Sequence, residues 1–261
     1  MKIWYQSFSR IGVDPKWNYY EQALKTQISK VARPDTVIDL HGVGKLHPKF
    51  TQYRYFLGLH ILQVIDNALQ AEREGYDAFI SGGMLDPGYF ELKEVLDIPV
   101  AFMAESSYHV ACLLAQKFAI IGAPDEVALR KIEDRIKLYG LEQHWVPGVH
   151  LGTMTLLEQV ADYTNNPQRV IDAVSEASRK SIELGAGILI PWSGTLSTFL
   201  ADKDVTEIDG VPVLDNGRVV IEMAELLVDL KNSGITRSKK GLYAAPSKEE
   251  VIEARKVYGV E

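Results

Sequence analysis

The sequence predicts an α/β protein of two similar lobes, each a four-stranded parallel sheet flanked by helices, related by a pseudo-twofold axis. Short apolar runs alternate with amphipathic helical patterns along all 261 residues, which is typical of parallel sheets covered on both faces. The runs also fall into two sets of four that end alike, in Ile98-Pro99-Val100 and in Val211-Pro212-Val213. We interpret this repeat as an internal duplication rather than a coincidence of two α/β units.

The spacing of apolar residues predicts each strand and helix in turn. Strands are expected at residues 2–8, 36–40, 76–81, 99–104, 118–123, 144–149, 187–192 and 211–215. Residues 57–73 place apolar side chains at helical spacing, and the tail 247–259 reads as a capped helix that packs back on the first lobe. The chain is expected to cross between lobes near Glu105 and Asp215, so that residues 1–105 and 216–261 form lobe 1 and residues 106–215 form lobe 2.

Composition excludes several classes of function. The net charge of −7 argues against nucleic acid, because such binding depends on Lys and Arg contacts to phosphate. The sequence shows no signal peptide and no apolar run near the roughly 20 residues that a membrane helix needs. The single cysteine, Cys112, excludes a disulfide framework and favours a cytoplasmic location. The histidines lack the paired spacing of a zinc site, so we expect no metal. We also expect a homo-oligomer.

The ends of the expected strands predict a binding site. In open parallel sheets, ligands lie beyond the carboxyl ends of the strands, and helix N-termini there attract anions. Two facing lobes would bring several such ends to one cleft, which suits a small carboxylate or a cyclic amide. The simpler interpretation is that Asp86, Ser106, Ser107 and Thr195 are only helix caps. The expected substrate-binding residues are Gln6, Ser7, Ser81, Gly82, Gly83, Ser106, Ser107, Trp192, Ser193 and Gly194.

The stretch EGYDAFISGGMLDPGYFELKEVLDIPVAFMAESSYHVACLLAQKFAIIGAP resembles the aspartate/glutamate/hydantoin racemase superfamily, closest to its hydantoin racemase branch. The resemblance implies two α/β lobes with the active site between them. It also implies catalysis without a cofactor by two cysteines, one from each lobe. Matching the Asp-Pro-Gly turn places Gly83 at the first cysteine position, and matching Ser193-Gly194 places Trp192 at the second. Neither residue can exchange a proton with carbon, and Cys112 reads as a small buried hydrophobe.

The arylmalonate decarboxylases of this superfamily have a glycine-like first position and keep the second cysteine. The chain resembles them at Gly83 and departs from them at Trp192. We therefore expect a thiol-free enzyme that forms an enolate or oxyanion, of the isomerase or decarboxylase type. Two alternatives stay open. One is a hydrolase that opens a cyclic amide, imide or lactone with activated water or Ser193. The other is a non-catalytic protein that binds small anions.

Four side chains are candidates to replace the thiols: His109, Glu105, His41 and Tyr55. His109 and Glu105 lie near the expected start of a helix at Ser106 or Ser107, as a base or as packing and capping groups. His41 and Tyr55 flank the loop HGVGKLHPKF, which is either a lid that also carries His47 and Tyr53 or a surface excursion. His60 falls on an apolar helix face and reads as a core histidine. Asp86 and Pro87 read as the N-cap and first residue of a helix.

Overall fold

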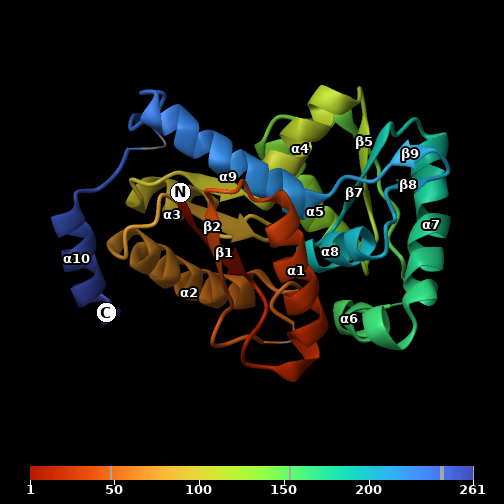
Figure 1. Ribbon diagram of the computed structural model, residues 1–261, viewed down its shortest axis with the longest axis horizontal. Helices are drawn as coiled ribbons and strands as arrows, with labels where there is room; N and C mark the ends of the chain where they lie inside the picture. Colours follow the sequence, from red (N-terminus) through yellow and green to blue (C-terminus); the bar gives the residue numbers. More distant parts are fainter. Residues whose placement is uncertain (48, 153, 242–243, 261) are drawn as a thin grey trace.

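The computed structural model describes residues 1–47, 49–152, 154–241 and 244–260. Two parallel sheets stand side by side, each flanked by helices, as the sequence predicts (Figure 1). The first sheet has the order β2-β1-β3-β4. Its strands are β1 (Lys2–Ser7), β2 (Val37–His41), β3 (Ala78–Gly82) and β4 (Val100–Phe102).

Alternating side chains divide the core of the first lobe between the two faces of this sheet. Ile3 and Tyr5 of β1 pack in one cluster with Leu24 of α1 (Asn18–Val31) and with apolar residues of α9 (Asn216–Asn232). Trp4, between them in sequence, packs in the other cluster with Val64 of α2 (Arg54–Arg73) and with α3 (Tyr89–Val95). The helix expected at 57–73 is confirmed and begins three residues earlier than expected.

The second sheet differs from the expectation in its fourth strand. Its order is β6-β5-β7, from β5 (Phe118–Ile121), β6 (Trp145–Val146) and β7 (Ile188–Pro191). The expected strand at 211–215 makes only an isolated parallel bridge from Val213 to Leu189. Instead, β9 (Val211–Pro212) forms a short antiparallel hairpin with β8 (Glu207–Ile208). Pro212 has no N–H to donate, which disfavours it inside a ladder.

Helices enclose the second sheet and link the two lobes. They are α4 (Met103–Leu114), α5 (Glu126–Leu138), α6 (Leu156–Asn165), α7 (Pro167–Glu183) and α8 (Gly194–Asp202), with short 3₁₀ turns at Pro15–Trp17 and Glu142–His144. Helix α4 packs against β5 and β7 but also against α9, which covers β3 and β4 of the first sheet. The two sheets are therefore joined by shared helices rather than by a flexible linker.

The turn after β3 corrects one sequence prediction. Helix α3 begins at Tyr89 with Gly88 as its N-cap, so Asp86 and Pro87 do not start it. Asp86 is buried and accepts hydrogen bonds from the backbone N–H groups of Ala104 and Glu105, at 2.9 and 2.8 Å. Asp86 thus satisfies the first turn of α4, which begins at Met103 rather than at Ser106 or Ser107.

The tail forms helix α10 (Lys248–Val257), with a capping box between Ser247 and Glu250. An ion pair of 2.8 Å from Arg255 to Asp66 holds it against α2 of the first lobe. The tail prediction is therefore confirmed. Within the described residues, no helix combines the length and apolar character that crossing a membrane requires.

Candidate functional site

A small cavity lies at the carboxyl ends of β1, β3 and β7, between the two sheets. Its volume is about 90 Å³. Segments that follow these strands line it, as the rule for open parallel sheets requires. The lining residues are Ser7, Phe8, Ser9, Trp17, Tyr20, Phe50, Thr51, Leu57, Gly82, Gly83, Met84, Leu85, Pro87, Leu156, Trp192, Ser193, Gly194 and Thr195. None of these described residues is acidic, basic, a histidine or a cysteine.

At the first position where the resemblance expects a thiol, a phenyl ring stands beside a glycine. A Cβ added to Gly83 would lie 2.5 Å from Cδ2 and 2.8 Å from Cε2 of Phe8. Real Cβ atoms do not approach other atoms so closely, so any side chain here would force the ring to move. The backbone of the Gly82-Gly83 turn therefore forms the cavity wall directly, and Phe8 fills the space beside it.

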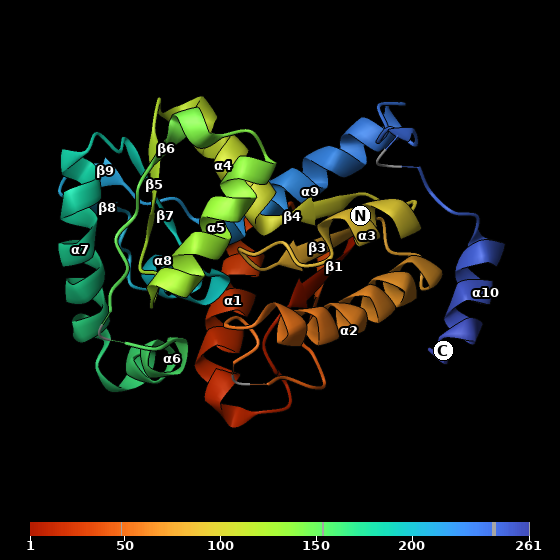
Figure 2. The same ribbon diagram turned by 180° about the vertical axis from the view of Figure 1, so that it is seen from behind.

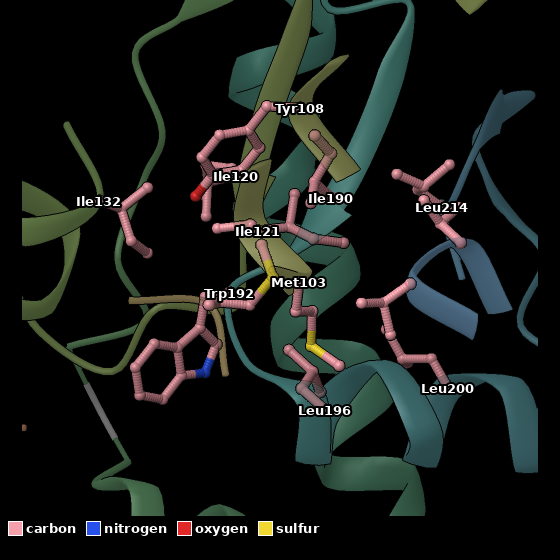
Figure 3. Close-up of a cluster of buried hydrophobic side chains, with 14 of the residues drawn as sticks. Met103, Tyr108, Ile120, Ile121, Ile132, Ile190, Trp192, Leu196, Leu200 and Leu214 are labelled. Carbon is pink, nitrogen blue, oxygen red and sulfur yellow. The ribbon is translucent and has the colours of Figure 1, made fainter. Parts of the chain in front are cut away.

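At the second position, Trp192 builds the wall from the other lobe. Its side chain is buried, and its indole Nε1 donates to Oε1 of Gln159 at 3.3 Å. Its backbone N–H donates to the carbonyl of Ile121 at 2.9 Å. Trp192 belongs to the same apolar cluster as Met103 and Leu196 (Figure 3). Aromatic side chains thus pack at or beside both positions where the resemblance expects a thiol.

Polar groups enter the cavity at the start of helix α8. Ser193 is the N-cap, and its Oγ accepts from the backbone N–H of Leu196 at 3.1 Å and lies 3.0 Å from Oγ1 of Thr195. The first N–H groups of a helix have no acceptor within the helix and carry its positive dipole end. Because Ser193, Gly194 and Thr195 line the cavity, this helix start can receive a carboxylate or carbonyl oxygen.

Hydroxyl groups form the β1 side of the cavity. Ser7 Oγ and Ser9 Oγ lie 2.8 Å apart, and Tyr20 of α1 bonds to Ser7. Burial raises the pKa of Tyr20 to about 12, although the hydrogen bond with Ser7 acts in the opposite direction. The phenol is therefore protonated at neutral pH. Among the described residues that line the cavity, Tyr20 alone has a titratable side chain, and its phenol can donate a proton to a substrate carbon.

Of the predicted substrate-binding residues, Ser7, Gly82, Gly83, Trp192, Ser193 and Gly194 line the cavity together. Gln6, Ser81 and Ser107 are buried but are not among its lining residues. The Gln6 side chain is engaged in the first lobe, where its Oε1 accepts from Trp4 at 3.1 Å and from Asn67 at 2.8 Å.

The predicted catalytic residues lie elsewhere. The ring of His41 stacks on Trp4 with centroids 3.4 Å apart, and burial lowers the pKa of His41. The side chain of Tyr55 is exposed at the start of α2. Glu105 and His109, with Ser106, border a second cavity beside α9. None of these four candidates lines the cavity at Gly83.

The loop before α2 does reach the cavity, but through residues that the sequence analysis did not select. Phe50 and Thr51 line it, whereas His47 accepts from the backbone N–H of Lys49 at 3.1 Å; Pro48 lies outside the described residues. His60 is buried as predicted, with its ring centroid 5.5 Å from that of Phe8 and 4.8 Å from that of Phe50. The loop therefore contacts the cavity through Phe50 and Thr51 and not through a histidine.

Sequence reasoning also missed Phe8, Trp17 and Tyr20. Each is a large aromatic residue at or just after an element boundary, so each reads as core until the fold brings it to the cavity. The described residues contain no group of three or more His, Cys, Asp or Glu side chains placed to hold a metal.

Comparisons with known proteins agree with this architecture. The family model for Asp/Glu/Hydantoin racemase matches residues 19–224. A hydantoin racemase from Pseudomonas sp. (strain NS671) is 30% identical over 230 residues, which cover 87% of each chain. The chain belongs to the Asp/Glu/hydantoin racemase family.

Solved structures give the same result for the fold. An allantoin racemase from Pseudomonas fluorescens superposes with a TM-score of 0.78 at 25% identity, over 94% of this chain and 97% of that one. The allantoin racemase from Klebsiella pneumoniae also has a TM-score of 0.78, at 21% identity over 95% and 94% of the chains. The two-lobed fold of this racemase family is therefore shown, and the family resemblance in the sequence is confirmed.

Proposed function

We propose that this family member is a cofactor-independent enzyme that acts on a small carboxylate or cyclic amide through an enolate or oxyanion, without thiols. The observation that carries the proposal is the cavity at Gly83. There the start of α8 and the Tyr20–Ser7–Ser9 hydroxyls border a space walled by Phe8, Phe50 and Trp192. The family's racemases support chemistry of the isomerase type.

The helix start and the apolar walls would bind different parts of the substrate. A carboxylate or imide oxygen would lie against the N–H groups of Gly194 and Thr195, where developing negative charge is stabilised. The substituent of the substrate would lie between Phe8 and Trp192. The apolar walls strengthen the electrostatic effect because they limit the water that competes for the oxygen.

Tyr20 is the proposed proton donor. In isomerisation, a solvent molecule accepts the proton that carbon loses, the enolate forms, and the phenol returns a proton to carbon. In decarboxylation of a substituted malonate, the C–C bond breaks, carbon dioxide leaves with the electron pair kept on the enolate, and the phenol protonates that carbon. Water then restores the phenol through Ser7 and Ser9. Isomerisation needs a second group to accept the first proton, whereas decarboxylation needs Tyr20 alone.

One observation favours a second candidate, a protein that binds small carboxylates or cyclic amides without turnover. The described residues that line the cavity include no thiol, carboxylate or imidazole, which are the usual acid–base groups of enzymes. Hydrolysis has less support, because Ser193 Oγ is engaged as the cap of α8 and the relatives are racemases.

A single incubation separates these possibilities. The protein is mixed in deuterated buffer with 5-substituted hydantoins, allantoin, 2-substituted malonates and cyclic imides, and the products are followed by NMR. Deuterium at the substituted carbon supports the proposal, with loss of carbon dioxide marking the decarboxylase version. A ring-opened product contradicts it in favour of hydrolysis. Thermal stabilisation by a ligand that stays unchanged supports the binding protein instead.

Three further expectations remain proposals. We propose that lobe 1 comprises residues 1–105 and 216–261 and lobe 2 residues 106–215, which is supported by the packing of α9 on β3 and β4. Assembly as a homo-oligomer and a cytoplasmic location stay predictions from the sequence.

A further inference from the structure

A second cavity of about 510 Å³ shares no lining residue with the one at Gly83. It is bounded by the edge strand β4, the start of α4, and α9 with the segment that follows it. Helix α9 runs along this side of the first sheet next to β4 and α4 (Figure 2). The lining residues are Lys93, Asp97, Ile98, Pro99, Val100, Ala101, Phe102, Glu105, Ser106, His109, Met223, Leu227, Leu230, Lys231, Ile235, Thr236, Arg237 and Ser238.

Two walls of this cavity are apolar. Pro99 and Val100 of the β4 region form one wall, and Met223, Leu227 and Leu230 of α9 form the other. These α9 residues lie three or four positions apart, so they share one helix face. A volume within the usual range of about 300–1,000 Å³ and apolar walls suit a small organic ligand.

At this cavity the carboxylates are paired with cations inside the protein. Both carboxylates already have cations: Glu105 lies 2.7 Å from Lys93, and Asp97 lies 2.5 Å from Lys239. Glu105 also accepts from the hydroxyl of Tyr89 at 2.6 Å. Their negative charge is therefore largely neutralised within the protein.

Two cations at this cavity, Arg237 and Lys231, have no carboxylate partner among the described residues. Arg237 donates through Nη2 to the carbonyl of Leu96 at 2.5 Å, while its Nη1 is buried with no hydrogen-bond partner among the described residues. Lys231 also lines the cavity, and no ion pair joins it to a carboxylate of the described chain. A buried guanidinium nitrogen without an acceptor is costly, and a carboxylate would relieve it by a charge-assisted hydrogen bond.

We propose that this cavity binds a small monocarboxylate with an apolar chain or ring. The carboxylate lies at Arg237 Nη1 and Lys231, and the apolar part lies between β4 and the Leu227 face of α9. This site is separate from the one at Gly83 and does not depend on the function proposed for it.

Hexanoate is the test ligand, with hexan-1-ol and hexylamine as partners of matched length. Binding to the wild-type protein is measured by titration calorimetry, and its place by NMR shifts. We expect hexanoate to bind more tightly than hexan-1-ol, and hexylamine to bind least. Arg237→Gln, whose shorter and neutral side chain removes the guanidinium, and Lys231→Gln should each weaken hexanoate binding about tenfold. Lys240→Gln, in the same segment but not lining the cavity, is the control and should bind as the wild type does.

Several outcomes would overturn the proposal. One is the absence of hexanoate binding up to about 10 mM. Another is equal affinity of the wild type and both cavity variants, which would place the ligand elsewhere. A third is a change in molar mass by light scattering in Arg237→Gln together with no hexanoate binding, which would assign the cavity to contact between subunits. Thermal unfolding of each variant checks that the fold is kept.

Discussion

The ring of Phe8 leaves no room for a side chain at Gly83: a Cβ at Gly83 would lie 2.5 Å from Cδ2 of Phe8. Phe8 follows β1, and Gly83 follows β3, the neighbouring strand in the sheet. The ring therefore occupies the space that a cysteine would need at the first thiol position of the family.

This relationship predicts an energetic coupling between the two positions. Gly83→Cys should lower the free energy of unfolding by about 1–3 kcal/mol, because it overpacks the wall. In a Phe8→Ala background the same change should cost little, because the space is free. Urea unfolding of the wild type, both single variants and the double variant measures the interaction energy, expected at about 0.5–3 kcal/mol. An identical cost of Gly83→Cys in both backgrounds would show that the Phe8 ring is not the cause of that cost.

Tyr20 is expected to carry the proton in any turnover at the cavity. Tyr20→Phe should lower the rate of deuterium incorporation or decarboxylation by about 10²–10⁴-fold, the usual contribution of a general acid or base. The matched control is Tyr19→Phe, since Tyr19 donates to Asp202 at 2.6 Å and does not line the cavity. Tyr20→Phe activity equal to that of Tyr19→Phe would remove Tyr20 from the mechanism.

His60 should make stability depend on pH. Burial lowers the pKa of His60 to about 4 from its ordinary value of 6.5, and the ring lies among Phe8 and Phe50 with Nε2 lacking a partner among the described residues. The unfolded chain therefore takes up a proton between pH 6.5 and 4 that the folded chain does not. The stabilisation is fully present above pH 6.5 and is lost as the pH falls toward 4.

The size of this loss is ~3 kcal/mol, at about 1.4 kcal/mol per pH unit of difference. Unfolding by urea at several pH values, for the wild type and His60→Gln, should show the extra slope in the wild type alone. His150→Gln, which changes an exposed imidazole, is the control and should keep the slope. Parallel curves for the wild type and His60→Gln would contradict the prediction.

The sequence predicted the strands and helices whose positions depend on local residue patterns. Apolar runs and helical spacing placed all the principal strands and helix 57–73, because the face that each element buries is written in the spacing of its own apolar residues. The strand expected at 211–215 was misread, since Val211-Pro212-Val213 resembles a buried run but Pro212 cannot complete the ladder. Gly83, Trp192, Ser193 and Gly194, which the family pattern selects, line one cavity.

Contacts between distant segments could not be predicted in this way. Tyr20 reaches the cavity only because α1 packs on the face of β1 that holds Ile3 and Tyr5. Glu105 lies in the first turn of α4, directly after a strand, yet its side chain contacts Lys93 and Tyr89 and borders the second cavity instead of the one at Gly83. A position at the end of a strand predicts nearness to the site, whereas the direction of the side chain depends on partners from other elements.

Asp86 connects the turn at Gly83 to the second lobe, and its substitution should loosen both. Besides the N–H groups of Ala104 and Glu105, its carboxylate accepts from the hydroxyl of Tyr139 at 2.6 Å. Burial raises the pKa of Asp86 to about 6, while these three donors act in the opposite direction. The buried carboxylate therefore holds the Gly83 turn, the start of α4 and the end of α5 together.

Asp86→Asn keeps the shape but turns an NH₂ group toward a donor, so at least one buried N–H or O–H loses its acceptor. We expect a loss of about 1–3 kcal/mol in the free energy of unfolding. Tyr139→Phe removes one donor and leaves both backbone bonds, so it should cost less, about 1 kcal/mol. Urea unfolding of the two variants compares them directly. A larger cost for Tyr139→Phe would mean that packing of the Tyr139 ring, rather than the cap on α4, is the main role of this contact.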